Sequence, residues 1–164
     1  MFSLVLARAA KPEELAEVLT GGSAEHLASR DSWSWADHVV RFVTGEQSGW
    51  AYALAFDSGL MPDEALDAVA RRWDVVTLWF DIQANSEFRF YREGALVRRC
   101  SVIGFGVEPS DGNPLPEEHG LFVDNVEWDQ RSDGLELVAR VTTTEPSESW
   151  WSKAPLAWTV QARF

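Results

Sequence analysis

The sequence predicts a single α+β domain spanning residues 1–164, with a mainly antiparallel sheet of five to seven strands and two helices packed on one face. Three observations predict this class. Apolar residues alternate with a period of two in several short segments. Two other segments open with a proline followed by acidic residues, which is typical of helix starts. The pair Glu93-Gly94 predicts a tight turn between two alternating segments.

The first strand and helix are expected near the N-terminus. Residues 2–7 form a short apolar strand segment. Pro12 suits the first position of a helix, and the following Glu13 and Glu14 suit its positive end. Apolar residues then recur with helical spacing until Gly21-Gly22 ends the pattern. The sequence therefore predicts a helix over about residues 12–20.

A hairpin and the second helix are expected next. Residues 38–44 and 50–56 are rich in β-branched and aromatic residues, and the turn-forming residues 45–49 separate them. Pro62 with two following acids repeats the helix-opening pattern. Apolar residues at i, i+3 and i+7 then predict a helix over about residues 62–73.

The segment from 74 to 102 predicts three further strands in a meander. One face of the first carries apolar side chains: Val76, Leu78, Phe80 and Ile82. In the second, Phe88 and Phe90 are expected to face the core, and the alternating residues to face solvent: Glu87, Arg89 and Tyr91. We therefore expect the aromatic side of these strands to be the dry face that the two proline-initiated helices cover.

Other segments are less regular. Residues 23–37 are expected to be loop with a short helix as the alternative, and residues 121–128 are ambiguous. Residues 108–119 contain three prolines and several acids, which predicts a surface loop. Residues 134–142 fit both the strand and the helix period. Residues 150–158 are apolar enough to pack back on the domain.

The order of segments also resembles a known family. The strings FSLVLARAAKPEELAEVL, HVVRFV with SGWAYALAF, and PDEALDAVARRWDVVTLWFDIQANSEFRFYREGAL are similar to small uncharacterised bacterial proteins that share a domain of unknown function. The resemblance covers about residues 2–100, and its marks are Trp50, Phe88, Phe90 and the Glu93-Gly94 turn. The resemblance identifies no catalytic residue in this chain. It implies a helix near the C-terminal end, which favours helix for residues 134–142.

Composition excludes several classes of function. The net charge is −12, whereas nucleic-acid backbones and anionic membranes both require a basic binding surface. A basic protein partner is compatible with this charge. No apolar run reaches membrane-spanning length, and Arg8 interrupts the short apolar start too early for a signal peptide. Cys100 is the single cysteine, which fits a reducing compartment, so we expect a cytoplasmic protein.

The sequence carries no recognisable catalytic motif. The nearest approach to a nucleophile set is Ser32, Asp37 and His38, but no Gly-x-Ser-x-Gly elbow accompanies it. Gly104 and Gly106 lack the third glycine and the following helix of a phosphate-binding loop. We therefore expect no catalytic residue and no cofactor. A protein without enzymatic activity is favoured over an enzyme.

Eight residues are candidate binding residues. The loop carries hard oxygen donors that suit a divalent cation, but they lack the ligand spacing of an EF-hand, so a solvated loop without metal is favoured. The loop candidates are Asp111, Asn113, Glu117 and Glu118. Four tryptophans lie outside the expected elements and could line a pocket or anchor an interface. They are Trp33, Trp35, Trp150 and Trp151. For these four tryptophans, a position in the core is favoured over a pocket or an interface.

Three functional hypotheses follow, and the third of them is a structural or accessory protein with no independent activity. The first is a non-enzymatic acidic module that binds a basic protein, such as an inhibitor of the immunity or antitoxin type, because complementary charge speeds association. The second is an enzyme or small-molecule carrier with a Trp-lined hydrophobic pocket between sheet and helices. Such a pocket would contain Trp33 or Trp35 beside a hydrophobic ligand.

Overall fold

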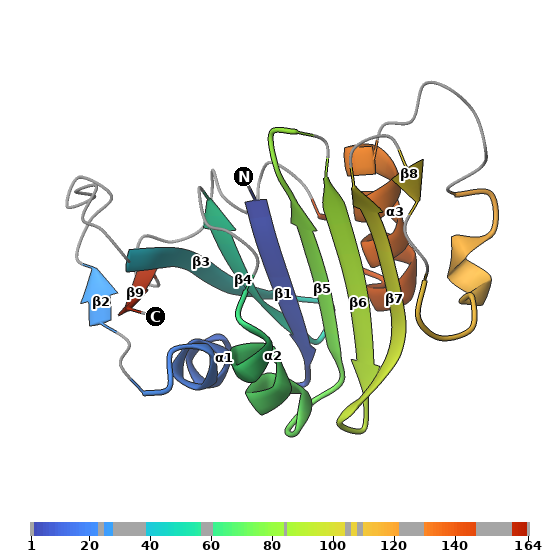
Figure 1. Ribbon diagram of the computed structural model, residues 1–164. Coiled ribbons are helices and arrows are strands. Elements are labelled where there is room, and N and C mark those ends of the chain that lie inside the picture. Colours follow the sequence, from blue (N-terminus) through green and yellow to red (C-terminus); the bar gives the residue numbers. More distant parts are fainter. Residues whose placement is uncertain are drawn as a thin grey trace.

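Within the described residues, nine antiparallel strands form one sheet in the order β2-β9-β3-β4-β1-β5-β6-β7-β8 (Figure 1). The computed structural model describes residues 2–22, 25–27, 39–56, 61–83, 85–103, 106–107, 110–121, 130–146 and 159–163. The strands are β1 (Phe2–Arg8), β2 (Glu25–Leu27), β3 (Val39–Gln47), β4 (Trp50–Phe56), β5 (Val75–Phe80), β6 (Ser86–Arg92), β7 (Ala95–Ile103), β8 (Gly106–Val107) and β9 (Thr159–Arg163). The helical elements are α1 (Pro12–Leu19), α2 (Asp63–Ala70), the 3-10 turn η2 (Pro116–Glu118) and α3 (Gln130–Thr142).

The predicted α+β class with an antiparallel sheet is confirmed. Strands β1 and β3 to β7 each have six or more residues, and these six match the expected five to seven. Three shorter strands extend the sheet at its two sides, namely β2 and β9 beyond β3, and β8 beyond β7. These short strands were hard to find in the sequence because each offers few residues in which to detect a period.

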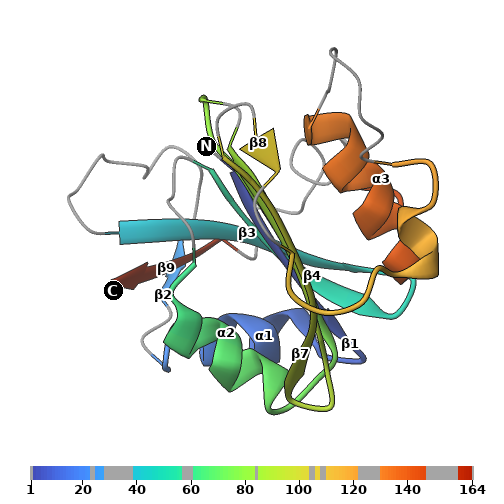
Figure 2. The ribbon, with the colours of Figure 1, turned by 45° about the vertical axis from the view of Figure 1, so that its right-hand side comes forward.

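Helices α1 and α2 lie side by side on one face of the sheet, as predicted (Figure 2). Leu15 and Leu19 of α1 and Leu66 and Val69 of α2 are all at most 2% exposed and pack with apolar residues of the sheet in one cluster. Helix α2 ends at Ala70, three residues before the predicted Trp73. The proline-and-acid pattern thus located both helix starts.

Helix α3 covers the opposite face of the sheet (Figure 2). Its Leu137 and Val138 are fully buried against a second apolar cluster, which includes Phe88 and Phe90. The helix expected over residues 134–142 is therefore confirmed. The sheet is consequently the middle of three layers.

The location of the aromatic face is a correction to the sequence-based expectation. Phe88 and Phe90 are buried, with 2% and 5% exposed, but they lie beneath α3 and not beneath the two proline-initiated helices. Alternation showed that the two rings share a face of β6. It contained no information on which helix packs against that face, because this depends on contacts distant in sequence.

The prediction that the other side of β6 faces solvent is wrong. Glu87, Arg89 and Tyr91 are only 6%, 7% and 6% exposed. Tyr91 belongs to the cluster under α1 and α2, because both faces of the sheet are covered. Ile82 is a second correction, since β5 ends at Phe80 and leaves Ile82 88% exposed.

Two tight turns fix the register of the predicted hairpins. Ser48 and Gly49 have φ angles of 52° and 77°, and Glu93 and Gly94 have 51° and 80°. Two successive left-handed residues are typical of the type I′ turn, whose twist matches that of paired strands. The hairpins β3–β4 and β6–β7 follow the predicted positions.

Three irregular segments fall largely outside the described residues. Of residues 23–37 the structure describes Glu25–Leu27, which pair as β2 with β9. Residues 122–129 and 147–158 lie outside the described residues. Strand β9 pairs with β3 and brings the C-terminal end of the chain back to the sheet.

Candidate functional site

The outer surfaces of α1 and α2 carry only acidic charges, although exposed Lys11 precedes α1 and exposed Arg71 and Arg72 follow α2. Each helix exposes three carboxylates, and neither helix contains a lysine or an arginine. The exposed residues, which we call the acidic helical face, are Glu13, Glu14, Glu17, Asp63, Glu64 and Asp67. Because the two helices are neighbours, the six carboxylates occupy one side of the molecule.

Local structure explains part of this acidity. The apolar residues of each helix turn toward the sheet, so the polar residues are left on the outside. Carboxylates in the first turn are stabilised by the positive end of the helix dipole. Glu14 also accepts a hydrogen bond from the backbone N–H of Lys11 at 3.3 Å. Glu17 and Asp67 lie beyond the first turn, where this stabilisation does not apply.

A second polar feature lies on the same face of the sheet as α1 and α2. Two rows of directly opposed residues cross neighbouring strands, and we call them the polar rows. They comprise Ser3, Trp79, Glu87 and Ser101 in one row and Thr77, Arg89 and Arg99 in the other. Five of the seven are at most 7% exposed, namely Ser3, Thr77, Glu87, Arg89 and Ser101. A buried polar surface of this size is unusual.

Glu87 is the centre of the polar rows. Its Oε1 accepts a hydrogen bond from Nε of Arg89 at 2.6 Å. Its Oε2 accepts from Nε of Arg99 at 2.7 Å and from Oγ of Ser101 at 2.9 Å. The buried carboxylate therefore has both oxygens occupied by charged or hydroxyl donors, which compensates its desolvation.

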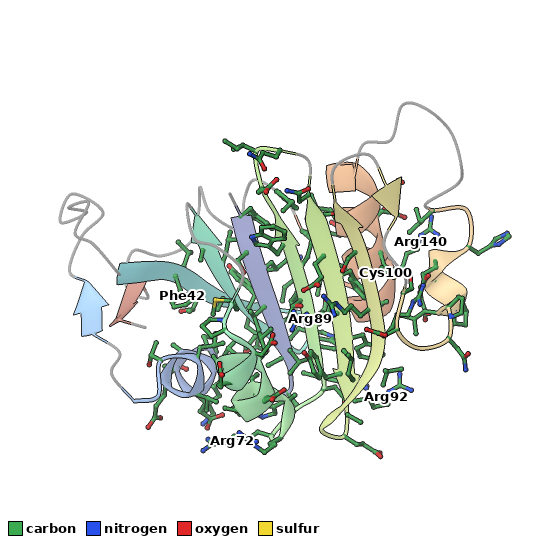
Figure 3. All side chains as sticks on the ribbon, in the orientation of Figure 1. Phe42, Arg72, Arg89, Arg92, Cys100 and Arg140 are labelled. Atoms are coloured by element: carbon green, nitrogen blue, oxygen red, sulfur yellow. The ribbon has the colours of Figure 1, made fainter. Side chains whose placement is uncertain are left out.

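Arg89 connects this network to the acidic helical face (Figure 3). Its Nη1 donates to Oδ1 of Asp63 at 2.6 Å and more weakly to the hydroxyl of Tyr91 at 3.4 Å. Burial lowers the pKa of Arg89, but the hydrogen bonds to Asp63 and Tyr91 and the charge of Glu87 outweigh it and raise that pKa. Asp63 itself is 71% exposed. The guanidinium thus stays charged while buried.

The predicted loop candidates do not converge on a cation site. Both carboxylate oxygens of Glu118 bind Arg98, and Glu117 contributes its carbonyl oxygen to Arg140. Asp111 and Asn113 are exposed, and Oδ2 of Asp111 lies 3.8 Å from Nη1 of Arg99. In the described part of the chain, no group of three or more His, Cys, Asp or Glu side chains is placed to hold a metal ion.

The four candidate tryptophans cannot be placed. Trp33, Trp35, Trp150 and Trp151 all lie outside the described residues. The described apolar side chains between the sheet and α1/α2 pack into a buried cluster. The hypothesis of a Trp-lined pocket stays a prediction.

Sequence reasoning missed the polar rows. The signal was present in the alternation of Glu87 and Arg89 with two phenylalanines, followed by Arg99 and Ser101 on the next strand. Alternation alone predicts a solvent-facing side for these residues. The helix favoured for residues 134–142 was not assigned to a face of the sheet, so the sequence did not predict that both faces are covered.

Comparison with known proteins adds no identity to this picture. No family model, no curated protein and no solved structure matches the chain. Among the helices that the structure describes, none is both long and apolar enough to cross a membrane.

Proposed function

We propose that this chain is a non-enzymatic protein-binding module that uses the acidic helical face to bind a basic protein. An inhibitor of the immunity or antitoxin type is the kind of protein that fits this size and charge. The observation that carries the proposal is the set of six exposed carboxylates on two adjacent helices that contain no basic residue. We further propose a bacterial, cytoplasmic protein, in line with the family that residues 2–100 resemble.

The physical argument is charge complementarity on a preorganised surface. The buried apolar residues of α1 and α2 fix the two helices on the sheet. Binding through their carboxylates therefore does not require the entropy loss of ordering a loop. Like charges at this density repel one another, and a cationic partner relieves this repulsion on binding. The same field accelerates encounter with a basic surface, and added salt weakens it.

The test compares two variants that carry the same change in net charge. The helix variant combines Glu13→Gln, Glu17→Gln, Glu64→Gln and Asp67→Asn. The control variant combines Glu46→Gln, Glu93→Gln, Glu117→Gln and Glu145→Gln, which lie outside both helices. Asp63 and Glu14 are left intact because they make structural hydrogen bonds.

Each protein is immobilised and exposed to extract of its host, and captured proteins are identified by mass spectrometry at low and moderate salt. A supporting result is one basic protein that the wild type and the control variant capture, that the helix variant loses, and that salt releases. The purified partner is then titrated against all three proteins. Equal affinity of the helix variant and the wild type for this partner would contradict the proposal.

A further inference from the structure

Three exposed cations border the acidic helical face at one end. Lys11 directly precedes α1, and Arg71 and Arg72 directly follow α2. Strand β1 leads into α1 and α2 leads into β5, and Ala7 of β1 is directly opposed to Val75 of β5. The start of α1 and the end of α2 therefore lie at the same end of the sheet. We call the three cations the basic edge.

The cations of the basic edge form no ion pair within the described residues. The ion pairs found there involve other cations: Arg8, Arg89, Arg98, Arg99 and Arg140. Asp67 precedes Arg71 by four residues, which is a spacing at which ion pairs form on a helix. Glu136 and Arg140 do pair at this spacing, at 2.8 Å, whereas Asp67 and Arg71 do not. The charges of the basic edge are thus available to a partner.

The position of Lys11 is unfavourable for helix α1. Lys11 is the N-cap residue, where the positive end of the helix dipole disfavours a cation and where Ser, Thr, Asp or Asn is preferred. Arg71 and Arg72 stand at the negative end of α2, which favours cations. Residues that break such a local rule are expected at functional sites. Helix stability therefore accounts for the two arginines but not for Lys11.

The outer side of α2 changes sign along its length. Glu64, Asp67 and Arg71 occur at i, i+3 and i+7, which places them on one side of the helix, and all three are exposed. Arg71 still has helical backbone angles, with a φ of −64° and a ψ of −18°. At the helical rise per residue, it lies about 10 Å along the axis from Glu64. A partner that lies along this side of α2 meets negative charges first and then a positive one.

We propose that the basic edge orients the partner of the acidic helical face. The matching surface of the partner is basic opposite the carboxylates and acidic where it reaches Lys11 and Arg71. This inference rests on the proposed function and adds to it the charge pattern of the partner. Opposite charges fix the register of an interface, and like charges that face each other reject a wrong partner. A partner turned around on this face would bring its basic residues against the basic edge.

The test compares two variants with the same change in net charge. The edge variant combines Lys11→Gln and Arg71→Gln. The control variant combines Arg8→Gln and Arg92→Gln, which are exposed residues at the ends of β1 and β6, on the face of the sheet that α3 covers. Circular dichroism checks that both variants are folded.

The probes are two alanine-rich helical peptides of equal length. The basic peptide carries lysines only, and the bipolar peptide carries glutamates in place of the lysines at one end. Each is titrated against wild type and both variants by calorimetry at low and moderate salt. We expect the edge variant to bind the bipolar peptide about three-fold more weakly than the control variant does, because it lacks cations that attract the glutamates. It should bind the basic peptide at least as tightly, because the removed cations repel lysine.

Equal affinity of the edge and control variants for the bipolar peptide would overturn the inference. An equal loss of affinity of the edge variant for both peptides would overturn it too. In either case the proposed function still holds if the helix variant loses the basic peptide. If the wild type binds neither peptide, the inference and the proposed function are both contradicted.

Discussion

Arg98 on β7 binds the carboxylate of Glu118 through two parallel hydrogen bonds, from Nε to Oε1 at 2.7 Å and from Nη2 to Oε2 at 2.9 Å. Its Nη1 also donates to the carbonyl oxygens of Asp111 and Gly112, at 3.3 Å and 3.0 Å. Arg140 of α3 donates to the carbonyls of Glu117 and His119 in the same segment (Figure 3). Residues 110–121 are thus attached both to the sheet and to α3.

Loss of the Glu118 carboxylate should be strongly destabilising. The hydrogen bond that Arg98 donates to Glu118 is the main cause that raises the pKa of Arg98, whose side chain is only 7% exposed. Glu118→Ala leaves that charge buried without its partner, which costs about 3–5 kcal/mol of unfolding free energy. Urea denaturation measures the loss. Glu117→Ala is the control and should cost under about 1 kcal/mol, because this residue contributes its backbone carbonyl. Equal losses in the two variants would contradict this role of Glu118.

Gly112 should not tolerate a side chain. It has a φ of +80°, and a Cβ atom there would overlap the carbonyl of Val97. Gly120 has a similar φ of +79° with no atom within 4 Å of the added Cβ. Gly120→Ala therefore reports the backbone strain alone, about 1–2 kcal/mol. We expect Gly112→Ala to lower the unfolding free energy clearly more than Gly120→Ala in thermal or urea denaturation. If the two variants are equally stable, the close approach of Gly112 to β7 is incorrect.

The packing of α3 on the aromatic face can be tested at Leu137. This side chain is fully buried against the cluster that contains Phe88 and Phe90. Leu137→Ala should lower the unfolding free energy by about 2–5 kcal/mol, through lost apolar burial and the cavity left behind. Leu135→Ala, at a partly buried position of the same helix, should cost less. A loss at Leu137 no larger than that at Leu135 would argue against this layer.

The Cys100 thiol should make stability fall at alkaline pH. Burial raises its pKa from 9.0 to about 11. Between these values the unfolded chain loses the thiol proton while the folded protein keeps it, so the contribution of Cys100 is complete below pH 9 and is lost as the pH approaches about 11. Urea midpoints measured across this window should fall more steeply for wild type than for Cys100→Ala, which removes the titrating group. Parallel pH profiles would contradict the assignment.

The sequence by itself determined the local elements of this protein. Pro12 and Pro62 marked the helix starts, and the glycine of each tight turn marked the hairpins, because caps and turns depend on residues a few positions apart. Alternation also placed Phe88 and Phe90 together on one side of β6, since successive side chains of a strand point to opposite faces.

Only the tertiary structure decided what covers each face and which polar residues are structural. Glu87 and Arg89 are buried because each is neutralised by a residue distant in sequence. Asp63, 26 residues before Arg89, pairs with Arg89, and Arg99, 12 residues after Glu87, pairs with Glu87. The sequence indicated only a loop carboxylate at Glu118, because its partner Arg98 lies 20 residues earlier. Such pairings depend on how strands and helices assemble, and a local period contains no record of partners that far along the chain.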